Sequence, residues 1–475
     1  MKKLFIQTKQ ESGQIIVLLA VSIMVLLVVA ALAVDGGMLY TQRRFAQNAA
    51  DASSLAGASK IANELVSDGI YYSNFVCTNT DMISSIQSGI STAQLRGTSN
   101  NFSDLDEIID PTINHGIYVD CHEEVNNKYI DFYVNITTET PTSFLHLINN
   151  NILYSTVQAV TRLYPMHDLG YGNAIVALNP VCSNPQDGLG FSGTNEIKIK
   201  GGGLWSNNCI RLNGPPNNQS PLIVKMVGTG ENPNPKANLL DPNGVNIING
   251  TLIPSEANIW PSEDVLDLTE EAFEIKNLLE KECGEFTGAE EKVTVSNNQV
   301  RNLSAGRYGS LSMTGGELNF VATESSSLFC FANGITINGG SVYGDPVTIY
   351  VKDIADNKAG DISISANAEV TLIAPFADAE DDFSILDGIL IFINPETNND
   401  VFLAGDGTSY FAGTIFTLNG DVTITGNPSV GSEATQVYST QIIAKNVDIS
   451  GNVAIDINFD INNTSIVDSK LHLLR

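Results

Sequence analysis

Positive charge, histidine and tryptophan are all scarce in this chain of 475 residues. It carries 24 Lys+Arg against 53 Asp+Glu, a formal net charge of −29, with 5 His and 2 Trp. So acidic a surface repels phosphate backbones, which argues against nucleic acid as a partner. The sequence has no CxxC pair, no HExxH motif and no phosphate-binding loop, and beyond residue 170 its only histidine is His472. These gaps predict a protein that is not an enzyme and uses no cofactor.

Cysteine is sparse but even in number. The residues are spread along the chain without metal-ligand spacing: Cys77, Cys121, Cys182, Cys209, Cys283 and Cys330. Such a set outside a membrane segment is typical of disulfides rather than of a zinc site. We favour pairing between sequence neighbours, because each bond then stays within one region. Free buried thiols are the alternative.

One uncharged stretch, Ile15 to Val34, is long enough to cross a bilayer. It reads IIVLLAVSIMVLLVVAALAV, and Ser22 is its only clearly polar residue. About 20 apolar residues span the hydrocarbon core as one helix. The lysines before it predict a cytoplasmic N-terminus over 1–14, although Arg43 and Arg44 argue for the opposite orientation. A cleaved secretory signal is the alternative, but no A-x-A-like site ends the run.

After the apolar run, the text VDGGMLYTQRRFAQNAADASSLAGA (34–58) predicts that the helix continues to about residue 66. Small residues recur in it three and four positions apart: Ala46, Ala49, Ala50, Ser53, Ser54 and Gly57. A stripe of small side chains lets another helix approach closely. Two interpretations stand side by side, packing on sister helices and packing on the protein's own small domain.

A small α+β domain is expected over 35–166. The sequence predicts a helix at 83–97, strands at 116–125 and 128–144, and a further element at 150–165. The segment 129–136 alternates between apolar and polar residues, as in a strand with one exposed face.

From 170 to 466 the sequence pattern changes. Short alternating runs, such as KNVDISGNVAIDINFD, are separated by Gly or Asn. Stacked strand–turn units of this kind form a β-helix or β-solenoid, and Asn and Gly suit left-handed corners. A β-sandwich is the competing fold. Residues 262–283 depart from the pattern and predict a helical insertion, or cap, that opens at Ser262 with acidic residues in its first turn.

The stretch 35–52 combines two motifs, Asp-Gly-Gly-x-x-Tyr and Arg-Arg-x-x-Gln-x-Ala-Ala-Asp-Ala. They fall on Asp35, Gly36, Gly37, Tyr40, Arg43, Arg44, Gln47, Ala49, Ala50, Asp51 and Ala52. With the apolar run before them, they resemble the N-terminus of the TadG-like proteins of Flp (Tad) pilus assembly. The resemblance is dense over 11–60 and loose after 170. It implies a single-pass envelope protein of a type IV-like pilus system, whose helix packs or assembles through these residues with other Tad proteins or with itself.

The same resemblance marks a candidate processing site. Pilins of such systems are cut after a glycine, and a glutamate follows shortly after the cut. Gly13 and Gln14 occupy the corresponding positions, but Leu18 stands where that glutamate is expected. Whether the chain is a filament subunit or a retained anchor therefore stays open.

Two acidic motifs bear on metal binding. Some TadG-like proteins carry a von Willebrand-type metal domain, and Asp361, Ser363 and Ser365 fit its Asp-x-Ser-x-Ser motif. That motif needs a buried strand leading into a helix, whereas another alternating strand follows here, so we expect a solvated strand face. The ADAEDD stretch at 377–382 offers carboxylates to a hard cation but fits no calcium-binding repeat. We expect a solvated loop there and no metal site.

Together these features predict a membrane-anchored α+β protein. Residues 1–14 are cytoplasmic, 15–34 span the membrane as a helix that continues into a small pilin-like domain (35–166), and a β-helix-like region (170–466) is displayed outside. We expect an assembly, pilus-associated or adhesive role, with the membrane, other pilus-assembly proteins and a surface or glycan ligand as partners. A membrane-anchored β-helix enzyme acting on polysaccharide and a surface-coat component are the alternatives.

Overall fold

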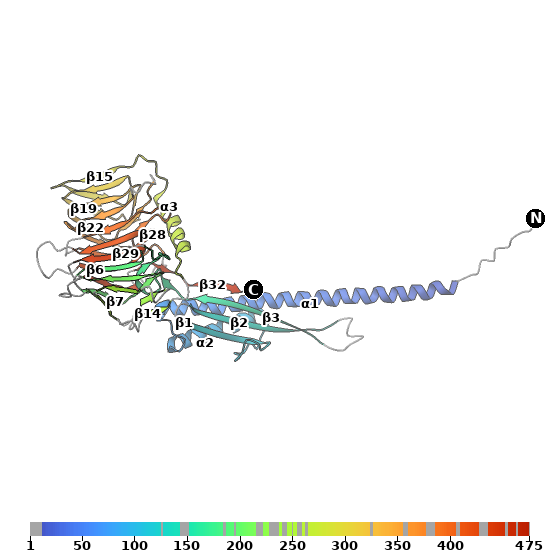
Figure 1. Cartoon of the computed structure of the whole chain (residues 1–475). Helices are drawn as coiled ribbons and strands as arrows, with labels where there is room; N and C mark the ends of the chain where they lie inside the picture. The colour runs from blue at the N-terminus through green and yellow to red at the C-terminus, as the bar shows by residue number, and fades with distance from the viewer. Residues whose placement is uncertain are drawn as a thin grey trace, which may run out of the picture.

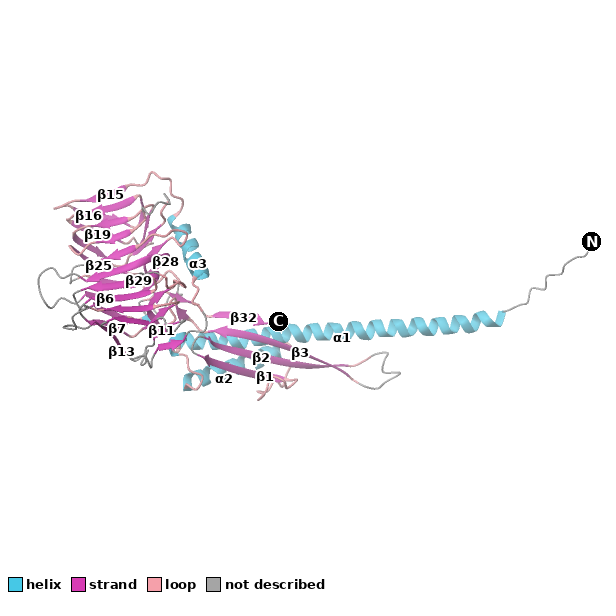
Figure 2. Cartoon of the chain, viewed as in Figure 1, coloured by secondary structure: helices cyan, strands magenta, loops and turns pink. Residues whose placement is uncertain are grey.

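The structure, a computed structural model of the whole chain, is a long helix that carries two folded parts at one end (Figures 1 and 2). It describes residues 12–124, 127–142, 152–183, 187–193, 196–214, 222–227, 237–239, 245–248, 250–253, 259–261, 265–323, 326–354, 360–376, 385–404, 409–426, 436–451, 455–461 and 464–474. One folded part surrounds the C-terminal half of the helix, and the other is a stack of strands beyond it.

The first part, here called the small domain, combines helices with a four-stranded antiparallel sheet. Its elements are α1 (Ser12–Ser67), the 3-10 helix η1 (Tyr72–Asn74), α2 (Thr80–Ser99), β1 (Gly116–Glu124), β2 (Asn127–Thr140), β3 (Leu153–Tyr164) and β32 (Lys470–Leu474). The strand order is β1-β2-β3-β32. Both α-helices and the first two strands are expected from the sequence, but β32 is not.

Alternation along the strands builds the core of the small domain. Ile130, Phe132, Val134 and Ile136 of β2 are all fully buried, because successive residues of a strand face opposite sides of the sheet. From the helices, this core receives Ile61, Leu65, Met82 and Ile90. It fixes the C-terminal half of α1 to the sheet.

The second part consists of short parallel strands stacked in coils. Most strands pair with the strand three places further along the chain, as β15 does with β18, β18 with β21 and β21 with β24. Three strands per coil, each lying on its equivalent in the next coil, is a β-helix-like arrangement. All described strand pairs in this sheet are parallel, so the β-sandwich alternative, whose sheets are antiparallel, is wrong.

The strands of this stack are β5 (Asn173–Ala177), β6 (Leu189–Gly193), β7 (Glu196–Lys200), β8 (Gly203–Ser206), β9 (Ile210–Asn213), β10 (Leu222–Val227), β11 (Ala237–Leu239), β12 (Val245–Ile248), β13 (Gly250–Ile253), β14 (Ile259–Pro261), β15 (Lys292–Val295), β16 (Val300–Ser304), β17 (Gly306–Tyr308), β18 (Ser310–Met313), β19 (Glu317–Val321), β20 (Leu328–Phe331), β21 (Ile335–Ile337), β22 (Gly340–Gly344), β23 (Thr348–Val351), β24 (Ile362–Ile364), β25 (Ala368–Ile373), β26 (Ile389–Ile393), β27 (Val401–Leu403), β28 (Tyr410–Gly426), β29 (Gln436–Gly451) and β30 (Ile455–Asn458).

Equivalent residues of successive coils form aliphatic columns inside the stack. One column is Val293, Leu311, Ile335, Ile362, Val401, Val422, Val447, Leu189 and Ile210. Every member is at most 2% exposed. Because the pairing is in register, each short apolar run of the sequence places its side chains directly over those of the next coil, and the stack shares one continuous core.

The coils are not stacked in sequence order. β29 pairs with β28 on one side and with β5 and β6 on the other, while β30 pairs with β7. The chain therefore enters the stack in its middle at β5 and winds to one end at β14. It resumes at the opposite end with β15 and returns to the middle, as a circularly permuted β-helix would (Figure 1).

The connection between the two ends contains α3 (Thr269–Cys283), which lies along the side of the stack (Figure 2). Its apolar face joins a cluster that includes Ala272, Ile275, Leu279, Tyr350 and Phe392. The expected start at Ser262 lies outside the described residues, but 265–268 are not helical, so the helix begins later than predicted. The reason is that the Asn207 side chain bonds both the N–H and the C=O of Leu266 and holds that residue out of a helix.

After the last coil the chain returns to the small domain. β31 (Ile466–Val467) pairs with β4 (His167–Asp168), and β32 then extends the sheet beside β3. The entrance and the exit of the stack therefore lie side by side. The small domain is closed by the last strand of the chain, whereas the sequence analysis confines it to 35–166.

Candidate functional site

The apolar half of α1 projects away from both folded parts (Figure 1). Between Ile15 and Val34 its exposed large side chains show 47% to 71% of their surface. Twenty helical residues rise about 30 Å, which is the thickness of the hydrocarbon core of a bilayer. Among the described residues this is the one helix long and apolar enough to cross a membrane. The run is therefore a candidate membrane anchor.

The second half of α1 buries its small residues inside the molecule. The buried set is Ala46, Ala49, Ala50, Ser53, Ser54, Gly57 and Ala58. A Cβ atom on Gly57 would lie 2.4 Å from Cζ of Phe132, and one on Gly89 of α2 would lie 2.5 Å from Cγ1 of Ile61. Close packing of α1 on the sheet and on α2 thus requires these small side chains. Of the two interpretations of the stripe, packing on the protein's own domain accounts for them.

The residues predicted for helix packing or assembly fall into three groups. Asp35, Ala49 and Ala50 are buried, Gln47, Asp51 and Ala52 are half-buried, and Gly36, Gly37, Tyr40, Arg43 and Arg44 are exposed. Nε2 of Gln47 donates to Oδ1 of Asp51 at 2.8 Å and to the backbone oxygen of Gln158 at 3.2 Å, which ties α1 to β3. The surface that this motif leaves to partners is the exposed group.

The candidate processing site lies at the start of α1. The helix begins at Ser12, so Gly13 and Gln14 occupy its first turn. Leu18, one turn further on, is 71% exposed. Cleavage between Gly13 and Gln14 would leave the whole apolar run on the mature chain.

The six cysteines form three disulfides between sequence neighbours, which is the pairing that the sequence analysis favours. The bonds are Cys77–Cys121, Cys182–Cys209 and Cys283–Cys330. The first joins the segment before α2 to β1, the second closes a corner of the stack, and the third fastens the end of α3 to β20. Disulfides of this kind form and persist in oxidising compartments, outside the cytosol.

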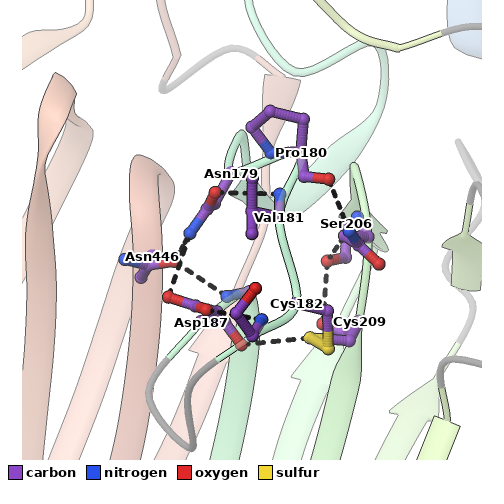
Figure 3. The surroundings of a disulfide bond; sticks show 11 residues. Asn179, Pro180, Val181, Cys182, Asp187, Ser206, Cys209 and Asn446 are labelled. Carbon is purple, nitrogen blue, oxygen red and sulfur yellow. Dashed lines mark hydrogen bonds between the residues drawn. A yellow bond between two sulfur atoms is a disulfide. The ribbon is translucent and has the colours of Figure 1, made fainter.

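A polar cluster adjoins the disulfide between Cys182 and Cys209 (Figure 3). Oδ1 of Asn446 accepts hydrogen bonds from Nδ2 of Asn179 at 2.9 Å and from the backbone nitrogen of Gly188 at 2.8 Å. These contacts join β29 to the corner between β5 and β6, where the two halves of the permuted stack meet. The cluster satisfies polar groups that the strands cannot pair, so we assign it a structural role.

Aspartates at another corner link successive coils. Oδ1 of Asp361 accepts from the backbone nitrogen of Asp400 at 2.9 Å, and Oδ1 of Asp400 accepts from that of Asp421 at 2.9 Å. The Asp-x-Ser-x-Ser motif is followed by β25 and not by a helix. No group of three or more His, Cys, Asp or Glu side chains within the described ranges could hold a metal. The ADAEDD stretch lies outside the described residues.

Two buried ionisable groups lie where β4 and β31 join the folded parts. The Asp168 carboxylate accepts from the backbone nitrogens of Gly170 at 2.9 Å and Gly172 at 2.6 Å, and from Nε2 of Gln441 at 2.5 Å. Burial raises the pKa of this carboxyl to about 6 in spite of those bonds. Gln441 belongs to β29, so Asp168 connects the junction directly to the middle of the stack.

His167 stands beside this carboxyl. Its ring stacks on that of Tyr171 with centroids 4.1 Å apart, and Tyr72 meets Tyr171 edge-on at 4.9 Å. Burial lowers the pKa of the His167 imidazole to about 4, so the ring is neutral at pH 7. The sequence alone gives no sign of a role for His167 or Asp168, because the strand that pairs with them lies about 300 residues further along the chain.

A polar and aromatic strip crosses the outer face of the stack. One column of paired residues is Asn302, Asn319, Tyr343, Thr371 and Tyr410, and the neighbouring column is Glu317, Ser341 and Glu369. Tyr343 is 50% exposed, and Nδ2 of Asn319 donates to Oδ1 of Asn302 at 3.1 Å. Each successive strand thus presents an amide, hydroxyl, carboxylate or aromatic side chain, at the strand spacing of about 4.8 Å.

Residues 13–60 match the family model of the TadE/G-like Flp pilus-assembly proteins. The matched range contains the apolar run and the whole motif at 35–52, and it ends where α1 is packed against α2. No curated protein matches the chain. The N-terminal segment is therefore a TadE/G-like pilus-assembly segment, as the sequence analysis predicts.

Proposed function

We propose that the chain is a single-pass envelope protein of a Tad (Flp) pilus system, with an assembly, pilus-associated or adhesive display role. The observation that carries the proposal is the family match at 13–60, which falls on a helix that is apolar and exposed at one end and packed into a folded domain at the other. Such a helix joins a membrane anchor rigidly to the part of the chain that is displayed.

The orientation in this proposal has the N-terminus in the cytoplasm and both folded parts outside. Three disulfides support it, because they belong to an oxidising compartment. The lysines before the apolar run agree with it. The exposed Tyr40, Arg43 and Arg44 then lie on the outer side, where they are available to other pilus-assembly proteins or to a second copy.

The displayed surface in this proposal is the strip on the stack. Its repeated amides, hydroxyls and the exposed Tyr343 ring offer hydrogen bonds and a stacking face, which is what a glycan or another polar surface needs. A ligand bound there would meet a polar or aromatic side chain on each successive coil. We include this surface or glycan ligand in the adhesive form of the proposal, without catalysis.

One observation favours the alternative, an anchored enzyme acting on polysaccharide. Glu317 and Glu369 flank Ser341 on adjacent strands, so their Cα atoms lie about 10 Å apart. Inverting glycosidases hold their two carboxyl groups about 6.5–9.5 Å apart. Both glutamates are exposed, however, and a general acid of this type owes its raised pKa to an apolar site. We therefore favour display.

Mass spectrometry of the N-terminus, on protein from membranes and from sheared filaments, tests the role. A mature chain that begins at Gln14 and occurs in filaments would identify a processed subunit. An intact N-terminus found only in membranes would identify a retained anchor with an assembly or display role. A chain that begins after Val34 would refute the anchor and with it the proposal.

A further inference from the structure

The strand β3 runs alongside α1 in the same direction, and two contacts fix their alignment. Gln47 of α1 donates to the backbone oxygen of Gln158, and Oγ1 of Thr161 lies 2.9 Å from Oγ of Ser54. Between these contacts the helix advances seven residues, about 10.5 Å, and the strand advances three residues, about 10 Å. The two axes therefore advance by nearly the same distance, and Figure 2 shows β3 beside the C-terminal half of α1.

Followed backwards, this alignment brings β3 to the end of the apolar run. Tyr154 precedes Gln158 by four strand residues, about 14 Å, which is nine helical residues before Gln47. Tyr154 is then level with Met38, and by the same reckoning Ile152 is level with Val34. Asp35, at this level, is only 1% exposed, so protein covers one side of the helix where the hydrocarbon core would end.

The side chains exposed at this level suit a membrane interface. Ile152 is 46% exposed, Tyr154 is 64% exposed, and Tyr40 of α1 is 69% exposed. The headgroup layer extends about 5–7 Å beyond the hydrocarbon core, which is the depth reached by four helical residues after Val34. Tyrosine gathers at this depth because its ring is apolar and its hydroxyl is polar.

Two arginines stand just outside this level. Arg43 and Arg44 are exposed and lie about 14 Å beyond Val34 along the helix. Helical side chains tilt toward the N-terminus of their helix, which here is the side of the membrane. Long cationic side chains can then extend to the headgroups. This pair is cationic in a chain whose formal net charge is −29, so an anionic layer attracts this end of the molecule and repels the rest.

We infer that the membrane-side end of β3 rests on the lipid headgroups beside α1, and that anionic phospholipids bind Arg43 and Arg44. This contact surface consists of Tyr40, Arg43, Arg44, Ile152 and Tyr154, and it depends on the proposed membrane anchor. Its occupant is the bilayer because the surface continues the apolar run without a break. The contact would hold the small domain, and the stack attached to it, in a fixed orientation on the membrane.

Fluorescence quenching in vesicles tests the contact on the full chain. Tyr154→Trp serves as the reporter, and Tyr343→Trp on the stack is the matched control, because that tyrosine is similarly exposed at 50% against 64%. The vesicles contain phosphatidylcholine brominated near the headgroup, and the parent chain gives the background of its own 2 Trp. We expect bromination to reduce the emission of the reporter and not that of the control. Equal losses in both variants would overturn the contact.

Flotation of the same vesicles separates this inference from the anchor. A chain that fails to float refutes the anchor itself, whereas a chain that floats without quenching at position 154 refutes only the contact. Phosphatidylglycerol then tests the lipid partner. We expect it to increase quenching in the reporter and to lose that effect when Arg43→Gln and Arg44→Gln are added. An increase that survives both substitutions would overturn the role of the arginines.

Discussion

Replacing Gly57 by alanine should loosen the small domain, although alanine is the better helix former. The added methyl would lie 2.4, 2.7 and 2.9 Å from three atoms of the Phe132 ring. Carbon atoms prefer separations of about 3.5–4.0 Å, so the overlap is roughly 1 Å. Phe132 is fully buried in the central strand β2 and cannot move into solvent. Overpacking of this kind costs about 1–3 kcal/mol, against a helix-propensity gain of about 1 kcal/mol, so we expect a net loss of up to about 2 kcal/mol.

Hydrogen exchange on the full chain measures this loss where it occurs, because one unfolding transition cannot represent two folded parts. Amides of β2 and β3 should exchange roughly tenfold faster, which corresponds to about 1.4 kcal/mol. Gly36→Ala is the matched control, because Gly36 lies in the same helix with nothing within 4 Å of a new Cβ. If Gly57→Ala protects these strands as well as Gly36→Ala does, the close approach of α1 to the sheet is refuted.

Two further predictions concern a disulfide and the buried junction. Replacing Cys77 and Cys121 by serine frees a loop with a sequence separation of 44. The added chain entropy of the unfolded state should cost about 4 kcal/mol of folding stability. Calorimetry should then show the unfolding transition of the small domain at a lower temperature, while that of the stack is unchanged. At the junction, burial lowers the pKa of the His167 imidazole from 6.5 to about 4. The unfolded chain therefore binds this proton at a higher pH than the folded chain does. As the pH falls from 6.5 to about 4, the parent protein loses up to about 3 kcal/mol of folding stability. Asp168, raised to about 6 from 3.8, has the opposite effect as pH falls through its own window. His167→Phe removes only the first effect. The melting temperature of the variant minus that of the parent should therefore increase as the pH falls from 7 to 4. A difference that stays constant would contradict the buried neutral histidine.

The parts of this fold that local patterns describe could be predicted from the sequence. An uncharged run such as Ile15 to Val34 predicts a helix by composition alone. Alternation over 129–136 predicts the strand correctly. The expected exposed face is wrong, because Asp131 is only 3% exposed and Asn135 only 2% exposed. The short runs after residue 170 predict a stack because each supplies one layer of a shared column. Neighbouring cysteines pair because each pair closes one local region.

The parts that depend on distant partners could not be predicted. β32 forms because it pairs with the edge of β3 at residues 160–164. The five residues of β32 carry no pattern that predicts this partner. The start of α3 moved because Asn207, far away in sequence, holds Leu266. The contact surface near Tyr154 depends on the alignment of β3 with α1, and alternation alone does not give that alignment.

Because the order of the stack is permuted, β29 and β30 form the coil that joins its two halves. Strands β5 to β14 lie on one side of this coil and β15 to β28 lie on the other, so the two half-stacks are joined through residues 436–458. Without this coil, each half would end in an open layer of aliphatic side chains, because Val447 of β29 covers Val422 on one side and Leu189 on the other. The same coil supplies Gln441 to the buried Asp168, beside the strand pair through which the chain leaves for the small domain. Completion of the stack and closure of the small domain therefore both depend on the segment from β29 to β32, residues 436–474.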